Sequence, residues 1–517
     1  MHLIELIDEK IEKIQSKTIF SLFIIILVGL AIRLYFTPWD IPTNSSDSFI
    51  LMIEGIAFSE GDLTYVSHRS LWPLFLSGFF SIFRFENYFE YMTLVRIISI
   101  SVSLATIPII YLISKEFVKE KYALLAAIFF TIESNLVENS IFGQTEPLFI
   151  LFGLVSFYFI IQKNQRYQIL AFIFAGLAFD VRVNGIVLIL LVIFALTIKI
   201  KNKKELIKKL IFGLIIFSLV IGPTHIIQPI LQDEPIFPFI KTVSVTISED
   251  MKHYSVSDSP EKRSPIEIIL NAIKNEFSHI FRISIPFLIM FFPIGIILTL
   301  KNIGYQEKIL FSAIIISLLI AVFQYTVSNE FRNLFFLIPF FCVFSVIGIE
   351  KMTEKIEIKN IFLILLVAGL ILLSANFLKE RYDIDKEYFL EKDDFGKYIV
   401  NNFDGNISGN MRLDIIRNMP DLKISSNFVN NKLAYFDPGI TINSISQLME
   451  YSQENKIEYL VIEEYIIQKH YPIFKDILSD KNQYIYLEEI FDSNSLDYKK
   501  FKAKIFKINW KLYNELQ

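Results

Sequence analysis

The sequence predicts a polytopic α-helical membrane protein that ends in a small α/β domain outside the membrane. The 517 residues are 53% hydrophobic with a mean hydropathy of +0.47, which is too apolar for a soluble chain of this length. Apolar stretches of membrane-spanning length recur as far as residue 378, and the chain beyond them is charged and rich in Asn. We therefore predict a transmembrane domain at 1–379 and a soluble α/β domain at 380–517.

Composition also excludes several classes of protein. The formal net charge is only −4 and no basic stripe is present, so no nucleic-acid partner is expected. The one cysteine, Cys342, excludes an intramolecular disulfide and a cysteine zinc motif, and its apolar surroundings predict a buried, inert thiol. Residues 1–17 are charged and carry an apolar helical stripe, which indicates an interfacial helix rather than a cleavable signal peptide.

We predict about eleven spans, because a helix needs about 20 apolar residues to cross a bilayer. They cover residues 18–36, 93–114, 121–138, 144–162, 167–180, 183–199, 206–229, 283–300, 309–327, 333–349 and 360–378.

The apolar stretch 71–83 is short for a span and contains Pro73 and Gly78. If it does not cross, the N-terminal lysines and the later basic loops all lie inside, as the positive-inside rule requires. If it crosses, nearly every basic loop lies outside. We therefore predict that 47–60 and 71–83 are two helices lying along the outer membrane surface, and that a third follows the capping box at 264–267.

This topology places the C-terminal domain outside the membrane. The sequence predicts strands at 458–464, 483–491 and 501–509, and a helix at 444–455 with Leu448 and Tyr451 facing a core. No cofactor motif is visible in this domain.

Charged side chains collect near the predicted outer ends of the spans. They are Asp47, His68, Arg69, Arg96, Glu138, Glu146, Asp180, Arg182, Glu330 and Arg332. Local explanations exist: Asp47 could cap a helix, Asp180 could pair with Arg182, and an arginine at a span end could reach lipid headgroups. Together, however, carboxylates suit general-base catalysis and arginines suit phosphate binding. The group therefore predicts a site that joins a membrane-held phosphate to a polar acceptor.

Six motifs follow one another in an informative order. They are "SSDSFILMIEGIAFSEG", "HRSLWPLFLSGFF", "LVRIISISVSLATIPIIYLISKEFVKEKYALLAAIFF", "IFGQTEPLFILFGLVSFY", "AGLAFDVRVNGIVLIL" and "EFRNLFFLIPFFCVFSVIGI". In this order the first 350 residues resemble the GT-C superfamily of polyprenyl-phosphate-sugar-dependent glycosyltransferases, and most of all the protein O-mannosyltransferases and lipid A aminoarabinose transferases. The resemblance implies a GT-C fold and transfer of a sugar, with inversion, from a polyprenyl (dolichyl or undecaprenyl) phosphate to an extracytoplasmic acceptor.

The resemblance also implies catalytic roles. Asp47 would be the base that takes the proton from the acceptor hydroxyl, and Glu146 would orient the partners of the base or the sugar. The apolar faces of 47–60 and 71–83 would bed the prenyl chain. A single Asp47, where relatives carry two acids, weakens a metal-dependent mechanism. No cofactor is expected, and a divalent metal stays an alternative without a ligand motif to support it.

A second set of residues would bind the lipid donor. By resemblance Arg332, with Arg182 or Arg69 as helpers, would hold the donor phosphate. His68 and Arg96 belong to the same set, Arg96 by holding the first outer loop against the spans.

The expected partners are a polyprenyl-phosphate-linked sugar, a protein, lipid or glycan acceptor, and membrane lipids. The protein is expected to be multi-pass, with its active site and C-terminal domain on the extracytoplasmic side. The alternative is a polytopic lipid or solute transporter or flippase without transferase activity. Such proteins often show two similar halves, and no clear internal repeat is visible in this sequence.

Overall fold

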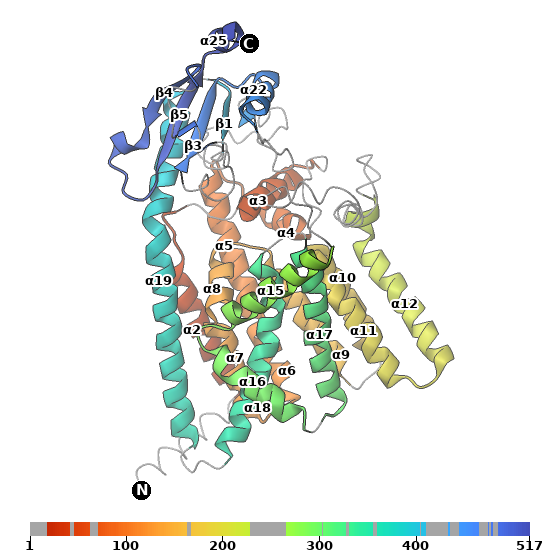
Figure 1. Ribbon diagram of the computed structural model, residues 1–517. Helices are drawn as coiled ribbons and strands as arrows, with labels where there is room; N and C mark the ends of the chain where they lie inside the picture. Colours follow the sequence, from red (N-terminus) through yellow and green to blue (C-terminus); the bar gives the residue numbers. More distant parts are fainter. Residues whose placement is uncertain are drawn as a thin grey trace.

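The described part of the chain is a helical bundle with a small sheet at one end (Figure 1). The computed structural model describes residues 18–41, 46–62, 71–162, 167–227, 265–301, 303–326, 330–354, 359–403, 405–409, 433–434, 444–464, 474, 477–478 and 484–516. The sheet stands beyond the bundle on the long helix α19 (Lys359–Asn402), and we call this side of the molecule the sheet end.

Each predicted span corresponds to a helix or a pair of helices. Their bounds are α2 (Thr18–Phe36), α5 (Tyr88–Ala105) with α6 (Ile107–Lys115), α7 (Glu120–Ile132) with α8 (Ser134–Ile141), α9 (Glu146–Ile161), α10 (Tyr167–Val181), α11 (Ile186–Lys199), α12 (Lys203–Gly222), α16 (Leu288–Thr299), α17 (Tyr305–Tyr325), α18 (Ile338–Thr353) and α19. Six of the described helices are long and apolar enough to cross a membrane, or eight if two bent pairs each count as one span. Because α9 and α10 are apolar but shorter, and α11 with the residues just before it is shorter too, the predicted number of spans is not confirmed.

Helices α3 (Ser46–Ser59) and α4 (Leu71–Phe80) correspond to the two predicted surface helices. Both lie toward the sheet end (Figure 1). The prediction that the apolar stripe of α3 faces lipid is wrong, because Phe49 and Met52 are at most 1% exposed. Phe49 packs edge-to-face on Tyr88 of α5, with ring centroids 5.6 Å apart. A Cβ at Gly55 would lie 3.2 Å from the carbonyl oxygen of Pro73 in α4. Helix α3 thus buries its apolar face inside the protein, where it is not left to bed a prenyl chain, whereas Leu74 of α4 is 47% exposed.

Helix α15 (Pro265–Ser284) corresponds to the third predicted surface helix. Ile266, Leu270 and Phe277 are 70%, 58% and 62% exposed, whereas Ala272 and Glu276 are 1% and 5% exposed. Residues 269–284 meet α16 at a bend of 109°. The helix therefore turns an apolar face outward at the edge of the bundle.

A polar cluster is enclosed within the bundle, and we call it the Arg33 cluster. The guanidinium of Arg33 has no exposed surface. Its Nε donates to Ser140 Oγ at 3.0 Å and its Nη2 donates to Ser103 Oγ at 2.9 Å. Its Nη1 donates to the carbonyls of Gly29 and Thr131, each at 3.2 Å. Every nitrogen of the guanidinium group thus has a partner, as burial of a charge requires.

The C-terminal domain contains a mixed sheet. Its strands are β1 (Ile407–Gly409), β2 (Leu433–Ala434), β3 (Tyr459–Glu463), β4 (Leu487–Asp492) and β5 (Ala503–Ile508), in the order β2-β1-β3-β5-β4. β1 runs parallel to β2 and β3, and β5 runs antiparallel to β3 and β4. Helix α22 (Ile445–Glu454) packs Leu448 against Leu460 and Phe506 in a separate small core. The predicted strands and helix are confirmed, whereas β1 and β2 were not predicted.

Helix α19 joins the two domains without a break at the predicted boundary of 379 and 380. The fully buried carboxylate of Glu463 in β3 accepts hydrogen bonds from Lys392 Nζ, at 2.9 Å, and from the hydroxyl of Tyr388. The carboxylate of Glu391 accepts from the backbone amides of residues 499–501 at 2.8–2.9 Å. The outer half of α19 is therefore fixed to the sheet, while its inner half packs on the bundle.

Candidate active site

Five charged side chains from separate segments of the chain meet at one site. Asp47 stands in the first turn of α3, Glu146 begins α9, and Arg182 follows α10. Glu330 and Arg332 lie at the start of the short 3-10 helix η4 (Phe331–Leu337), which leads into α18. We call this set the acid–arginine cluster.

Arg332 is the centre of the cluster. Its Nη2 lies 2.8 Å from Asp47 Oδ2 and also 2.8 Å from Glu330 Oε2. Its Nη1 donates to Gln144 Oε1 at 3.2 Å and lies 3.7 Å from Glu146 Oε1. One planar guanidinium thus connects α3, the start of α9 and η4, a geometry suited to its fork of donors.

Glu146 is the buried member of the cluster and contacts both arginines. Arg182 Nη1 lies 2.5 Å from Glu146 Oε1, the same oxygen that faces Arg332, and it also donates to Thr145 Oγ1 at 3.2 Å. The side chain of Glu146 is 2% exposed, whereas those of Arg182 and Arg332 are 19% and 18% exposed. Glu146 therefore holds the two arginines side by side from beneath.

The local sequence explains how Glu146 reaches this place. Gly143 has a φ of +68°, which ends α8 and turns the chain toward α9. A Cβ at Gly143 would come within 2.7 Å of Val95 Cγ1 in α5, so this turn also requires a glycine sterically. Pro147 then opens α9, where a carboxylate at the helix N-terminus is favoured by the helix dipole.

The members of the cluster differ in access. The side chains of Asp47 and Glu330 are 49% and 48% exposed, in contrast to buried Glu146. The set holds one more carboxylate than guanidinium groups. An exposed carboxylate beside an arginine can take a proton from a hydroxyl group, while the arginine stabilises negative charge on a neighbouring oxygen.

The structure brings together four of the predicted site residues: Asp47, Glu146, Arg182 and Arg332. Asp47 lies inside the first turn of α3 and its carboxylate contacts Arg332, so the contact to a side chain replaces the alternative of a simple helix cap. His68 and Arg69 lie outside the described residues.

Two other predicted residues are placed away from the cluster. Arg96 is 1% exposed, and its Nη1 and Nη2 donate to the carbonyls of Pro38 and Ile41, each at 2.8 Å. These contacts hold the chain that leaves α2 and give Arg96 no described contact with the acid–arginine cluster. The alternative of an Asp180–Arg182 pair is wrong, because Asp180 accepts a hydrogen bond from Thr224 and Arg182 pairs with Glu146.

Sequence reasoning missed the neutral members of the site. Gln144 and Thr145 each accept from an arginine of the cluster, and both stand directly before Glu146 in the motif "GQTEP". It also missed Arg282 at the end of α15, whose guanidinium carbon lies 4.3 Å from the ring centroid of Phe331. Proximity to Glu146 in the sequence could have indicated the first two, whereas the place of Arg282 depends on the bend after α15.

The donor set of the cluster does not fit a bound metal ion. Within the described segments, no three His, Cys, Asp or Glu side chains come together as a metal-binding group. The carboxylates of Asp47 and Glu330 face the same arginine nitrogen, whose positive charge disfavours a cation there. No metal-dependent step follows from this arrangement.

The fold is similar to those of two solved membrane proteins. ArnT from Cupriavidus metallidurans, solved with undecaprenyl phosphate, superposes with a TM-score of 0.59 at 10% identity, covering 94% of this chain and 97% of ArnT. The oligosaccharyltransferase of Archaeoglobus fulgidus, solved with zinc and sulfate, gives 0.56 at 14% identity over 91% of this chain and 71% of its own. At these identities the likeness is one of fold, and it confirms the predicted GT-C fold.

The sequence gives a narrower similarity. Residues 68–226 match the family described as dolichyl-phosphate-mannose-protein mannosyltransferase. A comparison with curated proteins gives no match. Residues 68–226 are thus similar to a mannosyltransferase family, and the chain has the GT-C fold that it shares with ArnT, in line with the motif order.

Proposed function

We propose that this protein transfers a sugar from a polyprenyl phosphate to a hydroxyl-bearing acceptor, in one inverting displacement at the acid–arginine cluster. The observation that carries the proposal is the contact of exposed Asp47 with Arg332, and of Arg332 with buried Glu146. A base and a phosphate-holding group then lie within one hydrogen bond of each other, as the reaction needs.

In the proposed step the acceptor oxygen forms a bond to the anomeric carbon and its proton passes to Asp47. The bond from that carbon to the lipid phosphate breaks, and the electron pair leaves with the phosphate oxygen. Arg332 and Arg182 stabilise the charge that develops there, and both are partly exposed toward the site. Glu146 is a positioning residue that keeps the two guanidinium groups together.

The donor lipid is proposed to approach along α15 rather than along α3 and α4. The apolar face of α15 is exposed, whereas the stripe of α3 is buried. The last turn of α15 places Arg282 on the ring of Phe331, next to Arg332 in the chain. An apolar chain lying on α15 would thus bring its phosphate end to the cluster.

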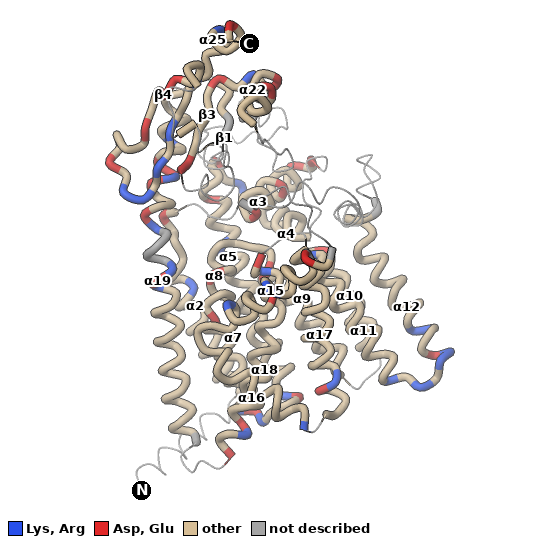
Figure 2. Tube along the Cα trace, in the orientation of Figure 1, with Lys and Arg blue, Asp and Glu red and all other residues tan. Residues whose placement is uncertain are grey.

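The sheet end is proposed to face the extracytoplasmic side. Lys and Arg gather at the opposite end, at the start of α12 and at the ends of α16 and α18 (Figure 2). Cytoplasmic loops carry such an excess of basic residues. The active site and the C-terminal domain would then work outside the membrane.

The test is a matched pair of substitutions, Asp47→Asn and Glu330→Gln. Both side chains lie 2.8 Å from Arg332 Nη2 and are about equally exposed, so each substitution removes one charge from the same arginine. If Asp47 is the base, Asp47→Asn reduces transfer by roughly 100- to 10,000-fold, while Glu330→Gln gives a loss of at most several-fold. The readout is mass spectrometry of surface glycans in cells in which each variant replaces the wild-type protein. Equal losses in the two variants would assign Asp47 an electrostatic role only.

Arg332→Lys separates the arginine from the base. Lysine keeps the charge and loses the fork of donors that bridges Asp47, Gln144 and Glu146. We expect transfer to fall roughly 100-fold, with an impaired apparent affinity for the lipid donor. An unchanged apparent affinity would remove Arg332 from the phosphate site.

A further inference from the structure

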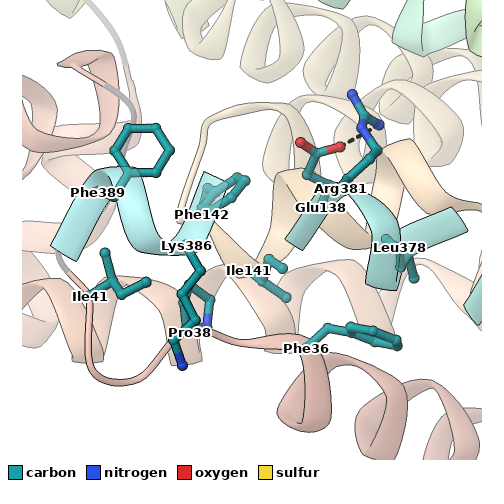
Figure 3. A pocket seen from close by; sticks show the side chains of 10 residues that line it. All are labelled: Phe36, Pro38, Ile41, Glu138, Ile141, Phe142, Leu378, Arg381, Lys386 and Phe389. Carbon is teal, nitrogen blue, oxygen red and sulfur yellow. Dashed lines mark ion pairs between the residues drawn. The ribbon is translucent and has the colours of Figure 1, made fainter. Parts of the chain in front are cut away.

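A pocket opens between α2, α8 and α19 at the sheet end, apart from the acid–arginine cluster (Figure 3). Helix α2 and the residues after it contribute Phe36, Pro38 and Ile41, and Arg381 and Lys386 come from α19. It lies where α19 leaves the bundle to carry the sheet.

The wall of the pocket combines apolar side chains with the charged side chains of Glu138, Arg381 and Lys386. Phe36 ends the apolar helix α2, and Leu378 ends the apolar part of α19, so these two side chains mark the edge of the membrane-spanning region. Arg381 stands one turn beyond Leu378, and Lys386 follows further along α19. Figure 3 shows Phe36 and Leu378 on one side of the pocket and Phe389 on the other. Apolar and charged side chains next to each other at the edge of the membrane-spanning region suit a membrane lipid at the level of its headgroup.

The three charged residues of the wall take part in two ion pairs, one of them with Asp40 outside the lining. Arg381 Nη1 lies 2.5 Å from Glu138 Oε2, and Lys386 Nζ lies 3.0 Å from Asp40 Oδ2. All four side chains are between 28% and 56% exposed, so water reaches them. The pairs link α19 to α8 and to the loop after α2.

Arg381 has donors left for a further acceptor. Among the described residues its hydrogen bond to Asn135 Oδ1, at 3.3 Å, and its pair with Glu138 both use Nη1. Nε and Nη2 point to no described acceptor, although a guanidinium group presents five N–H donors. A phosphate group offers the acceptors that this fork prefers.

We propose that this pocket binds the phosphate and the upper acyl chain of a glycerophospholipid, which bridges α19 to α2 and α8. The phosphate accepts hydrogen bonds from Arg381, with Lys386 as a second cation, and the chain lies against Phe36 and Leu378. This binding is independent of the proposed transferase activity. Because the outer half of α19 is fixed to the sheet through Glu463, the bound lipid also sets how the C-terminal domain stands on the bundle.

The experiment is native mass spectrometry of the full chain in detergent, with dioleoylphosphatidylglycerol as the probe. Dioleoylglycerol, which has the same chains and no phosphate, is the matched probe. We expect the wild-type protein to retain the phospholipid and not dioleoylglycerol. Substitution of Arg381 by Gln reduces retention by roughly tenfold or more, since a hydrogen bond to a charged group contributes about 1.5–3 kcal/mol.

Glu138→Gln breaks the same ion pair from its acidic side. It removes a negative charge and frees Arg381, so retention of the phospholipid stays equal or rises. If the ion pair were only structural, breaking it from either side would have the same effect. Lys397→Gln, on the same helix but paired with Asp393 away from the pocket, gives the baseline. Should Arg381→Gln not fold, Leu378→Trp fills the apolar part of the pocket with all charges intact and must also reduce retention.

Three outcomes would overturn the proposal. They are equal retention by Arg381→Gln and wild type, equal retention of dioleoylglycerol and phospholipid, and recovery of the bound lipid with a sugar attached. The last result would make the occupant a substrate rather than a resident lipid. None of these readouts requires transfer to be detected, so failure here is distinct from failure of the proposed function.

Discussion

Two polar clusters in the same bundle show how burial separates a structural arginine from a functional one. Arg33 is enclosed, and its Nε and Nη2 donate to the hydroxyls of Ser140 and Ser103. Arg332 is partly exposed, and its Nη2 is shared by the two exposed carboxylates of Asp47 and Glu330. In the first cluster, neutral hydroxyl and carbonyl oxygens accept from the single guanidinium group of Arg33. In the acid–arginine cluster, three carboxylates face two guanidinium groups, so one negative charge is left over.

The difference has a physical cause. A charge without access to water must be satisfied completely by its neighbours, and such an arrangement leaves nothing to bind a ligand. In a cluster that water reaches, one carboxylate can replace another as the partner of an arginine, because water screens the surplus negative charge. A substrate phosphate can then replace a carboxylate as the partner of Arg332.

The largest effect on stability is expected from Arg33→Met. The substitution keeps a long apolar stem but leaves buried Ser103, Ser140 and two carbonyls without their donor. We expect a loss of about 3 kcal/mol or more in unfolding free energy, seen as a lower unfolding midpoint and a lower yield of monodisperse protein. Arg332→Met is the comparison and should cost less stability while it abolishes transfer. A smaller effect at Arg33 than at Arg332 would refute the division by burial.

Glu146→Gln tests the one buried residue of the exposed cluster. The amide keeps the size of the side chain but removes the charge that holds Arg182 and Arg332 together. We expect transfer to fall roughly 100-fold, because a displacement of about 1 Å in a positioned group has an effect of this size. Initial transfer rates and the unfolding midpoint are measured together.

Glu350→Gln is the control for that substitution. Glu350 lies on α18 and is 8% exposed. Its Oε1 is 3.9 Å from Lys119 Nζ, which makes a weak ion pair. Both glutamates are buried, but only Glu146 contacts the arginines of the cluster. Transfer that fell equally in both variants would indicate a general effect on folding.

The smallest effect on stability is expected in the C-terminal domain. There Lys504 forms a partly buried ion pair that can be compared with the enclosed Arg33. Its Nζ lies 3.1 Å from Asp492 Oδ2 and 3.2 Å from Glu489 Oε2. Burial alone would lower the pKa of Lys504, but the hydrogen bonds and charges of these two carboxylates raise it above its usual value. The stabilisation is therefore complete below the unfolded pKa of about 10.4 and is lost as the pH rises through the folded pKa.

We expect Lys504→Met to destabilise the protein by about 1 kcal/mol at most near neutral pH, and by less once the pH has risen through the folded pKa of Lys504. The difference in unfolding midpoint between variant and wild type, followed against pH, measures this. A difference that grew with pH would contradict the sign of the pKa shift. An effect as large as that of Arg33→Met would show that burial is not what sets the scale.

Local patterns explain why much of the fold was predictable. The length of apolar runs marked the spans, short runs of strand-forming residues marked β3 and β5, and the capping box marked the start of α15. The stripe of α3 misled, because amphipathicity shows that a face is buried but does not show whether lipid or protein covers it. Strands β1 and β2 span only three and two residues, too short for a period to be visible.

The site was predictable by residue type and less so by contact. Asp47, Glu146, Arg182 and Arg332 stood out as charges near apolar spans. Their pairing did not follow, because Asp180 and Arg182 are neighbours in sequence and yet contact Thr224 and Glu146. Hydrogen bonds across 188 or 285 positions, as from Arg332 to Gln144 and to Asp47, depend on how the helices pack.

The sequence by itself determined that this chain is a multi-span membrane protein, because the cost of placing polar residues in lipid constrains hydropathy so strongly, and the order of its motifs resembled the GT-C superfamily. It also determined which few charges stand close to the membrane. Only the tertiary structure decided which of them meet, that α3 turns its stripe inward while α15 turns its own outward, and that α19 continues into the sheet. These outcomes depend on packing between distant segments, where many local patterns are compatible and the burial of shared surface selects one.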